Sequence, residues 1–287
     1  MATLKISYRD CSSSNLDEQL EKLHIDTVPQ ATEPYQEAIL FLRAVDSRAS
    51  QALPAFYLLL GASCHLEDKT TSYSKLVLAH SIRFSSALTV SLCCRKVFDE
   101  SRDKMTGKRF ANISDADLIK VADYWSKNPG KNKSDAIKAL NFLRDIFKRC
   151  SWPIKNLVKE KSLLERRVGL LKLHANLEAA HISMEPYSYR LLDVAHVVGS
   201  MALVGTIIHD FDNPSSSTGY YDSLDKAGWE AGWEAGRSIF PNLPTDRLFE
   251  NFDMVQQATN YWNSNPKEGL KMLMEGLPAA IGWWKSV

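Results

Sequence analysis

Residues 187–209 read YSYRLLDVAHVVGSMALVGTIIH, and this stretch decides the fold class because it predicts a helix that is apolar on almost every side. Such a helix belongs at the centre of a bundle, where neighbouring helices cover it all round. Glu185-Pro186 marks its start, since proline disfavours helical geometry in the residue before it. We therefore expect an all-α protein, folded as a multi-helix bundle.

The covering helices are expected where apolar residues recur every three to four positions. Caps and breakers bound several of these segments: Pro54 starts or kinks one helix, Ser114 with Asp117 resembles a capping box, and Pro153 precedes a long helix. Alternation of Leu4, Ile6 and Tyr8 predicts one short strand over residues 3–8. The expected helices are 15–23, 33–61, 71–100, 114–128, a helix begun by Ser134 or Asp135, 154–182, 246–263 and 266–274.

The domain organisation follows from one linker. DFDNPSSST, residues 210–218, combines Asn-Pro with serines and favours turn over helix. We predict an N-terminal segment over 1–30, a helical bundle over 31–212 and a helical C-terminal extension over 213–287. In the extension, GWEAGWEAG repeats every four residues and predicts Trp229 stacked over Trp233 on one helical face, with Ala227, Ala231 and Ala235 on another. Helix packing is the expected use of these small residues, and ring stacking on a ligand is the alternative.

Composition excludes several classes of protein. The 287 residues include 35 basic and 34 acidic side chains, a net charge of +1, so any contact with nucleic acid or anionic membrane has to be local. Five scattered cysteines without CxxC spacing argue against a disulfide framework or zinc site and favour a reducing compartment. No unbroken apolar run approaches the roughly 18 to 20 residues of a membrane span. We expect a cytoplasmic protein with no membrane partner.

The helix over 154–182 carries the most informative polar residues. At about 100° per residue, its four members Arg167, His174, Glu178 and His181 fall within an arc of about 60° that leucines flank. Glu165, Gly169, Lys172 and Asn176 occupy the opposite side. The row is therefore expected to point into the bundle. Because buried charges need partners, these residues either satisfy one another as a structural network or line a polar crevice.

RVGLLKLH, Arg167 to His174, resembles the Arg-x(4–6)-His signature of the HEPN superfamily of helical nucleotide-binding and ribonuclease domains. SLCCRKVFDESRD, ISDADLIKV and PYSYRLLDVAHVVGSMALV are similar in order and spacing to its abortive-infection U-type branch, over about residues 70–210. The resemblance implies metal-independent RNA cleavage, in phage defence or as a toxin, by a homodimer. It implies that Arg167 binds the scissile phosphate and His174 transfers the proton. Glu178 and His181 would orient them.

A second stretch, RLLDVAH, has the same kind of spacing and provides the candidate pair Arg190 and His196. These two lie about 120° apart on an ideal helix, whereas Arg167 and His174 lie about 20° apart and could face one phosphate. We prefer the first pair and keep the second. A basic loop contains Lys104, Lys108 and Arg109, which are the candidate nucleic-acid contacts; the alternative is a solvated loop.

Three interpretations of the sequence do not involve ribonuclease chemistry. Glu178-x-x-His181 and Asp193-x-x-His196 have the spacing by which ferritin-like bundles bind di-iron, although two further glutamates are not identifiable. The segment His209 to Asp212 could bind a cation or end a helix. The main alternative to RNA or nucleotide binding is a non-catalytic helical protein that binds a protein partner through its C-terminal helices. No Walker, GxGxxG, GxSxG or HExxH motif occurs, and we expect no metal and no cofactor.

Overall fold

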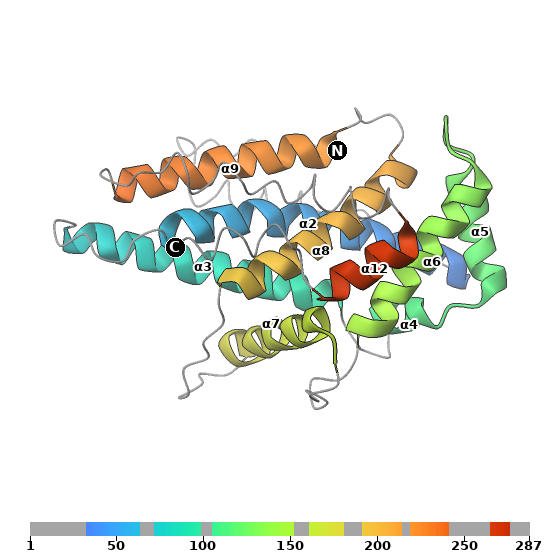
Figure 1. The fold of residues 1–287 in the computed structure, drawn as a ribbon, viewed down its shortest axis with the longest axis horizontal. Helices are drawn as coiled ribbons and strands as arrows, with labels where there is room; N and C mark the ends of the chain where they lie inside the picture. Colours follow the sequence, from blue (N-terminus) through green and yellow to red (C-terminus); the bar gives the residue numbers. More distant parts are fainter. Residues whose placement is uncertain are drawn as a thin grey trace, which may run out of the picture. The chain divides into compact units, whose positions relative to one another are not determined.

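A computed structural model describes residues 33–63, 72–98, 105–151, 161–180, 191–213, 219–240 and 265–275. Within these ranges the chain is all-α and has no strand, which confirms the predicted fold class (Figure 1). Of the two compact units, Met1–Glu33 and Pro34–Val287, the second holds every described helix. The strand predicted over 3–8 and the helices predicted over 15–23 and 246–263 lie outside the described residues. The helices are α2 (Pro34–Ser63), α3 (Tyr73–Val97), α4 (Gly107–Ala111), α5 (Asp115–Trp125), α6 (Lys133–Cys150), α7 (Leu163–Ala180), α8 (Leu191–Asp212), α9 (Tyr220–Ile239) and α12 (Pro266–Glu275).

The central position predicted for residues 187–209 is confirmed by α8. This helix contacts α2, α3, α6, α7 and α9, and its apolar side chains, among them Val194, Val198 and Met201, are fully buried. Because neighbours surround it, α8 needs no polar face. Its last turn reaches Asp212, so the first three residues of the predicted linker are helical.

Glycines bring α9 against α2. A Cβ atom added to Gly61 of α2 would overlap the carbonyl oxygen of Gly232 in α9, so only hydrogen fits between the two backbones. Gly228 and Gly236 are buried in the same contact, whereas Ala227 and Ala231 are exposed. The small residues that pack α9 are therefore the glycines of the GWEAGWEAG repeat rather than its alanines. In Figure 1, α9, α2 and α3 run side by side.

Side-chain caps start the shorter helices. The predicted cap at α5 is confirmed, because the Asp117 backbone N–H donates to Ser114 Oγ at 3.1 Å. In α6 the cap is Asn132, whose Oδ1 accepts from the Asp135 backbone N–H at 2.9 Å. That helix starts at Lys133, one residue before the first predicted start.

The start of α7 corrects the prediction of a helix from residue 154. Residues 161 and 162 are not helical, and α7 begins at Leu163. Ser162 and Glu165 form a capping box: Ser162 N–H donates to Glu165 Oε2 at 2.9 Å, and Glu165 N–H donates to Ser162 Oγ at 3.4 Å. The S-x-x-E signal at this position is visible in the sequence.

Two described helices reach the length and hydropathy of membrane spans, Tyr73–Val97 and Asp193–Asp212. The mean hydropathy of an 18-residue window identifies both helices, whereas the search for an unbroken apolar run identified neither. The second is the central helix α8, most of which is buried inside the bundle, so its apolar character is explained by the core. Only a third of the α3 window is buried.

Candidate functional site

The predicted row on α7 is buried where the structure describes it. Arg167 and His174 are 5% and 7% exposed, as expected for side chains that face the bundle interior. The side chain of Glu178 and the whole of His181 lie outside the described residues. Glu165 and Lys172, on the opposite side of α7, are buried as well. Arg166, which lies between these two sides of the helix, is exposed to solvent.

Arg167 lies at the centre of a chain of contacts that joins α7, α8 and α12. Its Nε donates to Asp193 Oδ1 at 2.7 Å, and its Nη1 lies 2.8 Å from His196 Nδ1. His196 Nε2 lies 2.6 Å from the carbonyl oxygen of Leu273. Because a guanidinium only donates, His196 Nδ1 must accept, and Nε2 must carry the proton that it donates to Leu273. One tautomer of the neutral ring satisfies both contacts.

Burial fixes the charge state of His196. Its side chain is 1% exposed, and burial, followed by the positive charge of Arg167, lowers its pKa to about 4 despite the opposing effects of the Leu273 hydrogen bond and Asp193. The ring is therefore neutral at pH 7. Protonating Nδ1 would break its hydrogen bond to Arg167, so His196 is a poor candidate for a general base.

The lowered pKa predicts a stability that depends on pH. Below its ordinary pKa of 6.5 the unfolded chain protonates His196 and the folded chain does not, so stability is full above pH 6.5 and is lost as pH falls toward 4. This one group contributes about 1.4 kcal/mol per pH unit in that window. Urea unfolding at pH 7 and pH 5 should show a loss of about 2 kcal/mol from this group.

His196→Gln should remove that part of the pH dependence, because glutamine does not titrate. The exposed histidine of α3 provides the control: His80→Gln should leave the difference between pH 7 and pH 5 unchanged. Equal pH dependence in wild type and His196→Gln would contradict the assigned charge state.

His174 faces a different helix. Its Nδ1 lies 2.8 Å from Ser91 Oγ of α3, and Cys94 Sγ lies 4.0 Å from the carbonyl oxygen of Val168 along the same seam. Arg167 and His174 are separated by two helical turns, about 10 Å along the axis. Their described partners lie on α8 and α3, so these contacts do not direct the two side chains to one point.

The structure brings together one residue from each of the two predicted pairs. Arg190 lies outside the described residues, and His196 contacts Arg167 of the first pair instead. Asp193 completes this contact from one turn earlier on α8. Sequence reasoning had placed Asp193 only in a metal-binding pair, and it missed Ser91 and Leu273. The signal available for Asp193 was a carboxylate at the start of a mostly apolar helix, far from the two aspartates at its end, because a buried carboxylate requires a cation as its partner.

Asp193 and His196 do share one face of α8, as their spacing predicts, but the cation between them is a guanidinium. Asp193 Oδ1 and His196 Nδ1, the atoms that a metal would use, both accept from Arg167. Among the described residues, no three His, Cys, Asp or Glu side chains are grouped as metal ligands.

The segment from His209 to Asp212 ends α8 in ion pairs. His209 Nδ1 lies 3.1 Å from Asp46 Oδ2, and Tyr221 donates to Asp46 Oδ1 at 2.7 Å. The carboxylates that a metal cation would use already bind basic side chains: Asp210 binds Lys131 at 2.8 Å, and Asp212 binds Arg43 at 2.6 Å. These contacts favour the helix-end interpretation.

The tryptophans of α9 stack as predicted, with the rings of Trp229 and Trp233 nearly parallel at 8° and their centroids 6.3 Å apart. Both side chains are half-buried against the core. Arg237 lies over the Trp233 ring at 4.6 Å. The described contacts thus use these rings in packing and cation–π interaction.

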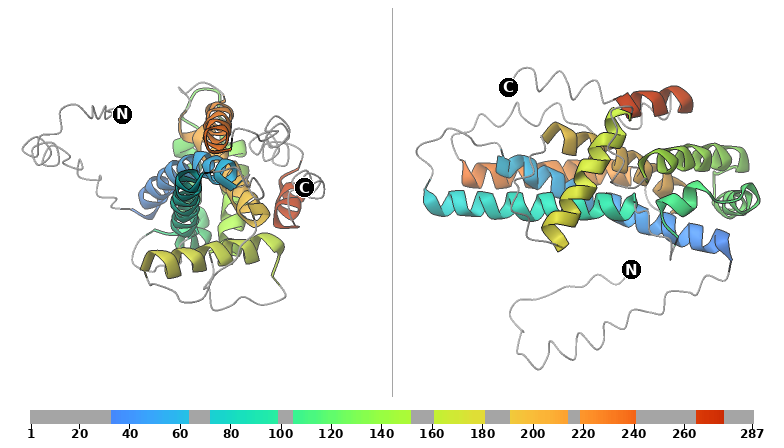
Figure 2. Two further views of the ribbon diagram at one scale, coloured as in Figure 1. Left: turned by 90° about the vertical axis from the view of Figure 1, so that its left-hand side faces the viewer. Right: turned by 90° about the horizontal axis from the view of Figure 1, so that it is seen from below.

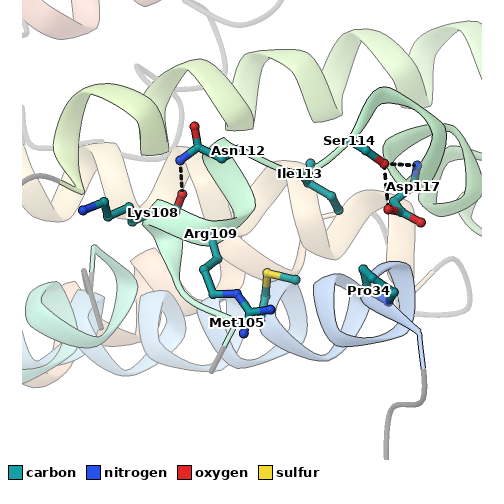
Figure 3. A pocket seen from close by; sticks show the side chains of 8 residues that line it. All are labelled: Pro34, Met105, Lys108, Arg109, Asn112, Ile113, Ser114 and Asp117. Atoms are coloured by element: carbon teal, nitrogen blue, oxygen red, sulfur yellow. Dashed lines mark hydrogen bonds between the residues drawn. The ribbon is translucent and has the colours of Figure 1, made fainter. Parts of the chain in front are cut away.

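The prediction of a loop is wrong for Lys108 and Arg109, which lie in the short helix α4. They border a pocket of about 430 Å³ between the start of α2, α4 and the start of α5 (Figure 3). Lys104 lies outside the described residues. Arg109 Nη2 lies 3.6 Å from Glu37 Oε2, and Ser114 Oγ donates to Asp117 Oδ2 at 2.7 Å. Lys108 has no ion-pair partner among the described residues, but Figure 3 shows it directed away from the rest of the lining. The pocket therefore presents little unpaired positive charge to a phosphate.

Three cysteines lie within the described residues, and all three are buried. Cys93, Cys94 and Cys150 are free, and burial raises the pKa of Cys94 to about 12. A thiol of this kind is unreactive.

Comparisons of this chain with protein families, with curated proteins and with solved structures give no match.

Proposed function

We propose that this chain is a non-catalytic helical binding protein of the cytoplasm, and that the N-terminal half of α3 is its binding surface. The observation that carries the proposal is apolar exposure. Five large apolar side chains of α3 face solvent, although a domain of this kind usually buries such a cluster. They are Tyr73, Leu76, Val77, Leu78 and Phe84.

The contacts of the Arg/His row support a structural role for it. Arg167 binds Asp193 and His196, and both ring nitrogens of His196 are engaged. A ribonuclease site would instead need an arginine open to phosphate and a histidine open to the attacking hydroxyl. The resemblance to HEPN ribonucleases favours RNA cleavage instead. RNA cleavage is therefore the hypothesis against which the proposal is tested.

Purified wild type is expected to leave total and defined RNA intact in the presence of EDTA. His174→Ala should lower the free energy of unfolding by about 2 kcal/mol, because it removes a buried ring and leaves Ser91 without this partner. RNA gels and thermal melts of the same preparations provide the measurements.

The matched control is His80→Ala, which truncates an exposed histidine of α3 and should leave the melting temperature unchanged. EDTA-resistant cleavage by wild type that is lost in a well-folded His174→Ala variant would overturn the proposal and favour the ribonuclease hypothesis.

A further inference from the structure

Four of the five exposed apolar residues of α3 lie toward one side of the helix, whereas Leu78 lies at least about 100° away from each of them. Tyr73, Val77, His80 and Phe84 are spaced by four, three and four residues, and Leu76 borders them. We call these five residues the α3 stripe; its first and last members, Tyr73 and Phe84, are 82% and 50% exposed. The stripe is about 16 Å long.

The stripe continues a face that is covered farther along the same helix. Seven residues beyond Phe84, Ser91 is fully buried and contacts His174 of α7. Figure 2 shows α7 crossing α3 there, with the N-terminal half of α3 extending past the crossing. One helical face is thus buried under α7 at one end and open at the other.

The hydroxyl groups beside the stripe are already satisfied by the helix itself. Ser81 Oγ donates to the Val77 carbonyl oxygen at 3.0 Å, Ser85 Oγ to that of Ser81 at 2.9 Å, and Thr89 Oγ1 to that of Ser85 at 2.8 Å. Hydroxyl donors bonded in this way can enter an apolar medium without losing a partner. The hydroxyl groups of Ser81, Ser85 and Thr89 therefore do not oppose transfer of the neighbouring apolar side chains out of water.

The charge on α3 has one sign. From Tyr73 to Val97 the helix contains Lys75, Arg83, Arg95 and Lys96 and no acidic residue. Arg83 flanks the stripe, whereas Lys75 lies nearly opposite it at about 100° per residue. Neither side chain forms an ion pair within the part of the chain that the structure describes. Two antiparallel copies of this face would place like charges together, whereas an anionic surface would neutralise them.

We propose that the α3 stripe binds an anionic lipid surface, with α3 lying parallel to that surface. This inference rests on the proposed function, in which α3 is the binding surface. Tyr73, Val77 and Phe84 enter the boundary between head groups and acyl chains, and Arg83 contacts the head groups. The helix lies on the bilayer and does not span it, because its C-terminal half is buried: Val90, Cys94 and Val97 are inaccessible to solvent.

The experiment measures binding of the full chain to vesicles, by sedimentation, with phosphatidylcholine alone or with about one-third phosphatidylserine. We expect binding to the mixed vesicles and about tenfold weaker binding to phosphatidylcholine. The double variant Val77→Ser/Phe84→Ser and the charge variant Arg83→Glu should each bind the mixed vesicles about tenfold more weakly than wild type. All three side chains are exposed, so thermal melts should match wild type.

The matched control is Ile119→Ser on α5, which also removes an exposed apolar side chain, 41% accessible, and should leave vesicle binding within about twofold. Absence of vesicle binding overturns the lipid proposal. If light scattering then shows self-association that Val77→Ser/Phe84→Ser abolishes, the surface binds protein and the proposed binding function stands. If those substitutions change neither vesicle binding nor self-association, both proposals fail.

Discussion

Replacing Asp193 with alanine is expected to lower the free energy of unfolding by about 3 to 5 kcal/mol, the range seen when one member of a buried ion pair is removed. Arg167 would remain buried at 5% exposure without its carboxylate, and its desolvation would no longer be compensated. The loss should be visible in urea unfolding near neutral pH, where His196 is neutral. A change below about 1 kcal/mol would show that Arg167 reaches solvent or another anion when Asp193 is absent.

Two comparisons isolate the pair. The double variant Arg167→Met/Asp193→Leu removes both charges and should recover at least about half of the loss, because an apolar pair needs no compensation. Asp123→Ala breaks the Lys133–Asp123 ion pair, whose 2.6 Å separation is similar but whose side chains are 49% and 47% exposed. It should cost less than about 1 kcal/mol.

Gly61→Ala is expected to destabilise the protein by about 3 kcal/mol or more, although alanine favours helices by about 1 kcal/mol over glycine. The added methyl group would overlap the backbone of Gly232, which has no side chain to move aside, so α2 and α9 would have to separate. Chemical denaturation monitored by circular dichroism tests this directly, since the sign of the change decides between overlap and helix propensity.

The neighbouring alanine of α9 supplies the control. Ala231 is exposed, so Ala231→Val adds carbon atoms to the same helix without meeting α2, and it should change stability by only about 0.5 kcal/mol. A Gly61→Ala variant more stable than wild type would show that the two helices do not approach as closely as described.

Periodicity predicted the helices well because each long segment has to bury a face. The mostly apolar helix was predicted correctly over 191–209, the described part of the stretch 187–209, and so was the cap at Ser114. The prediction failed mainly at helix ends. The start of α7 was set nine residues early, since apolar spacing continues upstream while the capping box at Ser162 stops the helix. A boundary depends on one local hydrogen bond, which an average over a window does not detect.

The candidate site was less predictable because it depends on which helices become neighbours. Helical geometry correctly gave Arg167 and His174 interior positions. It could not show that Arg167 meets Asp193 and His196 of α8 while His174 meets Ser91 of α3, because those partners lie 26, 29 and 83 residues away. The catalytic, nucleic-acid and partner assignments remain predictions.

The contact between α2 and α9 also constrains how the protein is made. Tyr57 donates to Asp225 at 2.6 Å across 168 residues of sequence, so during translation α2 leaves the ribosome long before the helix that covers it. At roughly 5 to 20 residues per second, the part of α2 that α9 covers stays exposed for on the order of ten seconds or longer, although α3 can pack on the rest of α2 earlier. The contact between α2 and α9 is therefore completed only late in synthesis, after the last residue of α9, Ile239, has left the ribosome.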